Sequence, residues 1–144
     1  MMRLGGSFLT DPLERQSALV REDFTAEHRE IGEAVRQFAR EKLLPRKDDL
    51  AALNWPLTKE LMLETSSMGL TGAEVPEAYG GLGLDRVSSA LIAEGLTTGQ
   101  CASFLVTYLA HTGIGTLPLV YFGSEALKQQ YLPRMVSVDL LGAY

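Results

Sequence analysis

The stretch 103–123, SFLVTYLAHTGIGTLPLVYFG, decides the fold that we expect for this chain. It lies in a run of 30 residues, between Glu94 and Glu125, that contains no Asp, Glu, Lys or Arg. A helix that is apolar on all sides is enclosed by protein, either as plain core or as one wall of an apolar ligand cavity. A membrane span needs about 20 predominantly apolar residues, whereas threonines, glycines, a histidine and a proline interrupt this run. We therefore expect a central helix of a helical domain and no membrane span.

Small and ionisable residues give the run two further properties. Ala110, Gly113 and Gly115 leave room for another backbone or a slender ligand to approach closely. His111 is the ionisable side chain of the run apart from Cys101 and the tyrosines. Because no Ser, Cys or acid motif accompanies it, we interpret His111 as a structural histidine rather than a catalytic one.

Outward from this run, start and stop signals predict further helices. These helices run from Thr25 to Pro45, from Asn54 to Gly69, from Asp85 to Leu96, and from Ser124 to Pro133. Between the second and the third, Pro76 and the glycines Gly80, Gly81 and Gly83 predict a tight turn in which at least one glycine takes a positive φ. We expect an all-α fold, a helical bundle of about five to six helices.

The two ends of the chain differ from this bundle. Residues 1–24 are weakly periodic and predict an N-terminal arm, and residues 25–135 are expected to form the helical domain. Residues 136–144 begin with Val136, Val138 and Leu140 in alternation, which predicts a strand-like piece at the beginning of a middle β domain. The apolar end predicts that the chain breaks off where another domain starts.

Composition excludes several classes of protein. The chain has 144 residues, a net charge of −5 and 46% hydrophobic residues, which is typical of one soluble globular domain. The acidic balance argues against nucleic acid or an anionic membrane as the partner. Cys101 has no second cysteine to pair with, and we find no metal-ligand spacing. The N-terminus has no secretory or mitochondrial pattern, so we expect a cytoplasmic protein.

Chemistry-bearing motifs are missing from the sequence. We find no nucleophile elbow, Walker loop, paired catalytic carboxylate or metal site. The glycines at 80–83 follow no convincing strand, so they are interpreted as a turn rather than as a phosphate cradle. The residues alone therefore predict a helical domain with an apolar wall, and they leave its function open.

Four strings of residues, in order along the chain, resemble one known family. They are VPEAYGGLGLD at 75–85, AHTGIG at 110–115, YFGSEALKQQYLPRM at 121–135 and LLGAY at 140–144. From about residue 25 to residue 144 the sequence resembles the N-terminal helical domain of the acyl-CoA dehydrogenase family. AHTGIG at 110–115 followed by FGSEALKQQYLP at 122–133, together with the long N-terminal arm, is most similar to the long-chain and very-long-chain branch.

This resemblance implies a larger flavoprotein. The complete protein is expected to add a middle β domain and a helical C-terminal domain that hold flavin adenine dinucleotide (FAD). A glutamate of the last domain removes the α-proton of acyl-CoA while the β-hydride passes to the flavin. No catalytic residue is therefore expected in this chain, and Glu94 and Glu125 are interpreted as structural or solvated. An electron-transfer flavoprotein or similar acceptor, homo-oligomerisation and inactivity of the 144-residue chain alone are also implied.

The resemblance also assigns binding residues one by one. Alignment through the Gly-x-x-Pro step at 115–118 places Val106, Thr107, Ala110 and Ile114 on the wall that lines the acyl chain. A small residue at position 110 leaves room for a longer chain. Tyr144 matches a position that contacts the flavin, directly before the Thr-Glu-Pro type signature that would follow.

Two other classes of function remain open at this point. One is a stand-alone helical module that binds a lipid or a partner helix without chemistry. The other is a flavin oxidase or monooxygenase on the same scaffold, since a fold does not fix a function.

Overall fold

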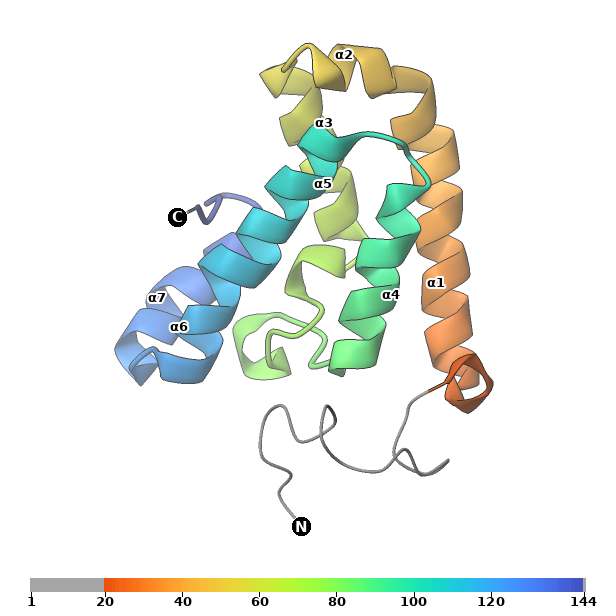
Figure 1. Ribbon diagram of the computed structural model, residues 1–144. Helices are drawn as coiled ribbons and strands as arrows, with labels where there is room; N and C mark the ends of the chain where they lie inside the picture. The colour runs from red at the N-terminus through yellow and green to blue at the C-terminus, as the bar shows by residue number, and fades with distance from the viewer. Residues whose placement is uncertain (1–19, 144) are drawn as a thin grey trace, which may run out of the picture.

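The computed structural model describes residues 20–143, and within that range the chain is built from helices and turns (Figure 1). The α-helices are α1 (Ala26–Phe38), α2 (Lys47–Ala51), α3 (Trp55–Ser67), α4 (Arg86–Thr97), α5 (Ala102–Leu109), α6 (Leu117–Phe122) and α7 (Glu125–Val136). No strand is present among the described residues. The all-α prediction is confirmed.

Two junctions between α-helices are themselves helical. A π-helical turn at Ala39–Leu43 and a 3₁₀ turn at Leu44–Arg46 join α1 to α2. A second π-helical stretch, Ala110–Thr116, joins α5 to α6 and is called the π segment below. Most of the charge-free run therefore forms one continuous helix, Ala102–Phe122. Counted in this way, the described residues form five helical rods, within the predicted five to six.

Four predicted helix starts are confirmed by their N-caps. The side chains of Thr25, Asn54, Asp85 and Ser124 accept hydrogen bonds from the backbone N–H three residues further on. Such bonds satisfy one of the free N–H groups at a helix N-terminus. Asp85 also contacts His28 Nε2 at 3.0 Å, so the cap of α4 is joined to the start of α1. Local sequence thus sets where these helices begin.

The helices α1 and α4 pack along each other on one side of the molecule (Figure 1). Gly95 allows the close approach, because a Cβ atom there would lie 2.8 Å from Cγ1 of Val35. The core continues from this pair under α3 and α5. Its fully buried members include Leu43, Leu61, Ile92 and Phe104.

The glycine-rich turn between α3 and α4 behaves as predicted. Gly80 has a φ of 85° and Gly83 a φ of 60°, a conformation that favours glycine. Gly81 is required for a different reason, since a Cβ atom on it would lie 2.0 Å from the carbonyl oxygen of Val75. These glycines are therefore explained by backbone conformation and close packing.

Two predicted helix ends are wrong. The helical path continues past Pro45 into α2, because proline fits the first turn of the 3₁₀ segment that begins at Leu44. Helix α7 likewise continues past Pro133 to Val136. The Val136 carbonyl accepts bonds of 2.7 Å from both Ser66 Oγ and Thr71 Oγ1. These tertiary bonds satisfy a carbonyl group at the helix C-terminus.

The strand-like piece after α7 is also absent from the described residues. Residues 137–140 form turns and bends, and Val138 takes a φ of 63° with its side chain buried. The Val138 N–H bonds to Met135 O, and the Leu140 N–H bonds to Arg134 O. The alternation of apolar residues was misleading because the chain folds back here instead of extending. The domain boundaries at 24 and 135 remain predictions, and residues 1–19 of the predicted arm lie outside the described residues.

Candidate functional site

The helix Ala102–Phe122 has two different faces. Its inner face carries Phe104, Tyr108, His111 and Thr116, each with at most 3% of its surface exposed. Its outer face exposes 64% of Val106 and 56% of Ile114. By length and composition alone the helix could cross a membrane. The buried face shows that it packs on this domain, so the expected enclosure is complete on one side only.

The four residues predicted to line the acyl chain lie on or beside this outer face. Val106 and Ile114 are exposed, and Thr107 and Ala110 are half-buried. The Thr107 hydroxyl donates to the Ser103 carbonyl at 2.9 Å, so it is already paired. These side chains, together with the small residue at position 110, form a mainly apolar surface. Such a surface suits an apolar ligand or another domain.

An open groove of about 400 Å³ begins at one end of this surface. Val106 and Thr107 line it together with Trp55 and Leu53, of which 55% and 77% are exposed. Ala110 and Ile114 are not part of the groove. The structure therefore brings two of the predicted residues into one depression and places the other two further along the helix.

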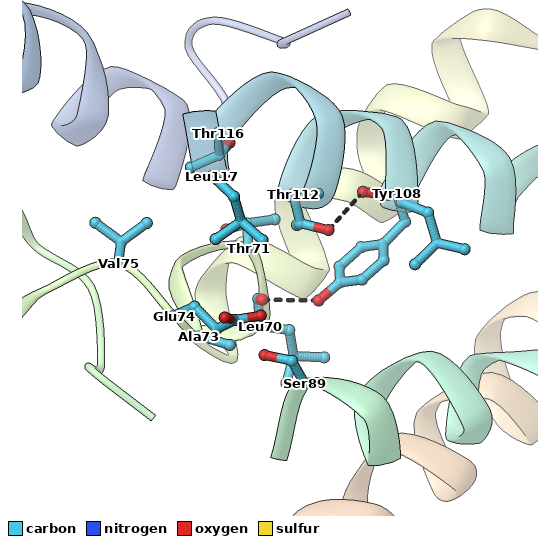
Figure 2. A pocket seen from close by; sticks show the side chains of 12 residues that line it. Leu70, Thr71, Ala73, Glu74, Val75, Ser89, Tyr108, Thr112, Thr116 and Leu117 are labelled. Carbon is cyan, nitrogen blue, oxygen red and sulfur yellow. Dashed lines mark hydrogen bonds between the residues drawn. The ribbon is translucent and has the colours of Figure 1, made fainter. Parts of the chain in front are cut away.

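A second cavity, of about 110 Å³, lies on the inner side of the helix (Figure 2). Its lining includes Leu70, Thr71, Glu74, Tyr108, Thr112 and Thr116. None of the four predicted residues contributes to it. Sequence reasoning missed this cavity, because its walls come from segments about 40 residues apart and no spacing pattern connects them.

The polar groups around this inner cavity already have partners. The Tyr108 hydroxyl donates to the Leu70 carbonyl at 2.8 Å, and the Thr112 hydroxyl donates to the Tyr108 carbonyl at 2.9 Å (Figure 2). Burial, with a smaller effect of the Glu74 charge, raises the pKa of Tyr108 above its ordinary value of 10.0. Tyr108 is therefore a neutral hydrogen-bond donor with a structural role.

The Glu74 carboxylate at the cavity also has a hydrogen-bond partner within the chain. The Tyr121 hydroxyl donates to Glu74 Oε2 at 3.2 Å, and Arg86 donates to the Tyr121 oxygen at 3.1 Å. The Arg86 guanidinium also lies 5.3 Å from the centre of the Tyr121 ring. This cluster ties α4 to α6 and holds the Glu74 carboxylate at the cavity through its Oε2 atom.

His111 is structural, as predicted. Its Nε2 lies 2.9 Å from the Met135 carbonyl oxygen, and its Nδ1 lies 3.0 Å from the Gly142 nitrogen. The Gly142 N–H must donate, so Nδ1 is the acceptor and Nε2 carries the proton. Burial lowers the pKa of His111, and the bond to Met135 opposes that shift. Both ring nitrogens of a neutral imidazole are therefore used within the chain.

The two glutamates that bracket the charge-free run have structural contacts. Glu94 pairs with Arg21 at 3.0 Å. Glu125 accepts a bond of 2.6 Å from the Tyr79 hydroxyl, and this bond, together with Lys128, lowers the pKa of Glu125. Within residues 20–143 there is no group of three metal-ligating side chains, and Cys101 is buried. The expectation that these glutamates are not catalytic agrees with this geometry.

The glycine-rich turn offers no free amides for a phosphate group. The N–H groups of Gly80, Gly81, Leu82 and Gly83 donate to the carbonyls of Glu77, Pro76, Gly72 and Val75, respectively. A phosphate cradle requires such N–H groups to point at the ligand. The interpretation as a conformational turn is therefore favoured.

Comparison with known proteins decides the family. The family model "Acyl-CoA dehydrogenase, N-terminal domain" matches residues 25–139. The chain belongs to the acyl-CoA dehydrogenase family. Within this family, the chain is 41% identical over 140 residues to a "Probable acyl-CoA dehydrogenase" of Bacillus subtilis (strain 168), a match that covers 97% of the chain and 23% of that relative.

Two solved structures have a similar fold, and the first of them supports this assignment. An acyl-CoA dehydrogenase complexed with FAD from Bacillus anthracis matches 96% of the chain and 24% of its own length, with a TM-score of 0.89 and 41% identity. A structure reported as an electron transferring flavoprotein of Acidaminococcus fermentans matches 85% of the chain and 32% of its own length, with a TM-score of 0.71 and 26% identity. The chain thus spans about a quarter to a third of the length of these acyl-CoA dehydrogenase relatives and similar structures.

The predicted flavin contact, Tyr144, lies outside the described residues. The segment that leads to it is described as far as residue 143. Gly142 packs against Gly115 of the π segment, since a Cβ atom on Gly115 would lie 2.6 Å from the Gly142 Cα. The prediction that small residues of the run permit close approach of another backbone is correct at Gly115.

Proposed function

We propose that this chain is the N-terminal part of an FAD-dependent acyl-CoA dehydrogenase that oxidises the α,β bond of a fatty acyl-CoA. The observation that carries this proposal is the match, over 96% of the chain, to an acyl-CoA dehydrogenase complexed with FAD. The long-chain and very-long-chain branch is the proposed specificity. It is supported by the small residue at position 110 and by the open groove next to Val106 and Thr107.

We propose that the outer face of Ala102–Phe122 forms one wall of the acyl-chain pocket. Val106 and Ile114 are large apolar side chains with more than half of their surface exposed in this domain. Ala110 lies between them and has no side chain beyond its Cβ atom. An acyl chain that packs against this wall would remove apolar surface from water. Each Å² so buried contributes about 25 cal/mol of favourable free energy.

We propose that this chain contributes one edge of the FAD site. The amides of the glycine-rich turn already have backbone partners, so this turn is not proposed to hold the diphosphate. The segment at Gly142 leads directly to Tyr144, the proposed flavin contact. When bound, FAD would accept the hydride from the β-carbon of the acyl thioester.

The 144-residue chain alone is proposed to be inactive. The two acids that bracket the charge-free run, Glu94 and Glu125, are held in contacts at the surface. Neither is positioned on the proposed acyl wall. Purified chain should show neither dehydrogenation of acyl-CoA nor yellow flavin that survives gel filtration, and stoichiometric bound flavin would contradict this proposal.

The proposed partners of the whole enzyme are an electron-transfer flavoprotein or a similar acceptor and further copies of itself. The structure from Acidaminococcus fermentans, reported as an electron transferring flavoprotein, supports the first. A cytoplasmic enzyme without a membrane span is proposed because the inner face of Ala102–Phe122 packs on its own domain. Turnover with oxygen in place of the acceptor would favour a flavin oxidase.

The substitution Ala110→Leu in the full-length enzyme tests the acyl wall. Its side chain should occupy the space over the acyl wall between Val106 and Ile114, and overpacking of a formed apolar site costs about 1–3 kcal/mol. We expect kcat/KM for long acyl-CoA substrates to fall by about 5- to 150-fold. Short substrates, which do not reach the site, should be affected little.

The control is Ala90→Leu, the same change at an exposed position of α4. It should leave the profile of kcat/KM against chain length unchanged. If Ala110→Leu lowered activity equally for all chain lengths and also lowered the melting temperature, the residue would be a packing position and the acyl wall would be placed wrongly. A wild-type enzyme without dehydrogenase activity on any acyl-CoA would contradict the proposed function itself.

A further inference from the structure

The buried side chain of His111 joins three parts of the chain. It lies in the π segment and is fully buried. Its Nε2 donates to the carbonyl oxygen of Met135 in the last turn of α7, at 2.9 Å. Its Nδ1 accepts from the Gly142 N–H at 3.0 Å. A single neutral tautomer thus binds both the end of α7 and the segment that returns from it.

The returning segment is held closely against the helix. In Figure 1 it runs from α7 back to the side of the helix Ala102–Phe122. A Cβ atom on Gly142 would lie 2.9 Å from the Gly115 Cα and 2.7 Å from the Met135 Cε. Leu141, one residue earlier, packs against the hydrophobic core. The backbone at Gly142 therefore has a defined place, and the bond to His111 fixes its orientation.

The loop that leads to this contact contains strained backbone. Val138 has a φ of 63°, which is unusual for a β-branched residue. The carbonyl of Val136 is fixed by Ser66 and Thr71, so the start of the loop is anchored to α3 and to the turn after it. Surrounding contacts have to maintain such a conformation. The bond from the Gly142 N–H to the His111 imidazole holds the other end of the loop.

The π segment therefore contributes to two regions at once. His111 and Gly115 hold the segment that leads to Tyr144. Ala110 and Ile114, on the same seven-residue stretch, belong to the proposed acyl wall. π-helical turns inside α-helices occur frequently at functional sites, because they change the direction of side chains locally.

We propose that His111 is a positioning residue that sets where the backbone at Gly142, two residues before Tyr144, lies relative to the acyl-chain wall. This inference rests on the proposed function, because Tyr144 is the residue proposed to contact the flavin. The neutral imidazole acts through the Gly142 N–H and contacts neither flavin nor substrate. Its effect on the reaction is to hold the flavin edge and the acyl chain in one geometry.

Two substitutions separate the two hydrogen bonds of the ring. The side-chain oxygen of Asn is as many bonds from Cα as Nδ1 of His, so His111→Asn keeps an acceptor for the Gly142 N–H. The side-chain nitrogen of Gln is as many bonds from Cα as Nε2, so His111→Gln keeps the donor to Met135. Each variant loses one bond, and both should lower the melting temperature by similar amounts.

The first measurement concerns the bond itself and needs no flavin. In the full-length protein, exchange of the Gly142 amide hydrogen should be about tenfold faster in His111→Gln than in His111→Asn, the equivalent of one net hydrogen bond. Equal exchange rates in the two variants would overturn the positioning role. Ile92→Val, which removes a fully buried methylene group in α4, is the control for loss of stability alone.

The second measurement concerns the flavin. The dissociation constant for FAD should rise by about tenfold in His111→Gln, with a shift of the flavin visible absorption band, and should change little in His111→Asn and Ile92→Val. If flavin affinity followed melting temperature across the three variants, His111 would be merely structural and the proposal would be overturned. A wild-type enzyme that binds no flavin would instead overturn the proposed function, while the exchange measurement still tests the contact between His111 and Gly142.

Discussion

The inner and outer faces of the helix Ala102–Phe122 are both largely apolar, but the rest of the domain covers only the inner one. On the inner face every polar group is paired, and Tyr108 and His111 bond to backbone atoms of distant segments. On the outer face Val106 and Ile114 leave more than half of their surface uncovered. Both faces contain apolar and small residues, so hydrophobicity alone does not distinguish them. What distinguishes them is which face the rest of the domain covers.

This difference matters for function. A covered face with satisfied polar groups contributes mainly to stability, because any change there leaves a cavity, a clash or an unpaired group. An uncovered apolar face contributes little to the stability of this domain and is available to a ligand or to another domain. Substitutions on the inner face should therefore affect folding, and those on the outer face should affect acyl-CoA specificity.

The largest effect on stability is expected from Gly115→Ala. The new Cβ atom would lie 2.6 Å from the Gly142 Cα, and both partners are backbone that cannot move aside easily. We expect the free energy of unfolding to fall by about 1–3 kcal/mol, as is typical of overpacking. Thermal and urea unfolding measure it.

Gly113→Ala is the matched control in the same π segment. A Cβ atom there has no neighbour within 4 Å. Since alanine favours a helix by about 0.8–1.0 kcal/mol over glycine, this variant should be as stable as the wild type or more stable. Equal destabilisation by both changes would mean that the close contact with Gly142 does not set the cost of the change at Gly115.

A smaller effect is expected from Tyr108→Phe on the inner face. The change removes the hydroxyl that donates to the Leu70 carbonyl and should lower the free energy of unfolding by about 0.5–1.5 kcal/mol. Tyr121→Phe removes a half-exposed hydroxyl that bonds to Glu74 and Arg86, and because these bonds are less desolvated than the bond of Tyr108 the loss should be smaller, at most about 0.5 kcal/mol. Denaturant midpoints compare the two. A larger loss for Tyr121→Phe would mean that burial does not set the cost of losing a tyrosine hydroxyl.

The smallest effect is expected from mild acid. Burial lowers the pKa of His111 below its unfolded value of 6.5, so its contribution to stability is complete above pH 6.5 and is lost as the pH falls from there toward the folded pKa. Between pH 7 and pH 6 the loss should be at most about 0.7 kcal/mol. The pKa of Asp85 is lowered mainly by the Ser88 N–H, so the corresponding loss occurs only at and below about pH 4.

Unfolding curves at pH 7 and pH 6 measure this change. The variant His111→Asn has no titrating group at this position. Its free energy of unfolding should therefore lack the part of the change between pH 7 and pH 6 that His111 causes. If the wild type and the variant responded alike, the loss would arise from another group and His111 would not be the acid-sensitive contact of the inner face.

Local signals in the sequence were sufficient for the frame of the domain. Thr25, Asn54, Asp85 and Ser124 cap helices where they were expected to, because an N-cap depends on a side chain and the backbone three residues away. The ends at Pro45 and Pro133 were not predictable in the same way. There, neighbouring helical turns and bonds from Ser66 and Thr71 decide where the helices end.

The candidate site could be predicted only in part. The charge-free run and the small residue Ala110 indicated a wall, and the family resemblance selected the four positions. The inner cavity with Tyr108 and Glu74 could not be found, since its lining comes from three separate segments. The second partner of His111, Gly142, could not be found either, because it lies 31 residues away in a segment that was expected to be a strand.

By itself, then, the sequence determined that the protein is helical, where four helices begin, and which helix is apolar throughout. These properties follow from contacts between residues within one or two helical turns and from the solubility of individual side chains. Only the tertiary structure decided which face of that helix is covered, why Gly115 has no side chain, and that His111 joins α7 to Gly142. Those properties depend on atoms that are far apart in the chain and become neighbours only when the helices pack.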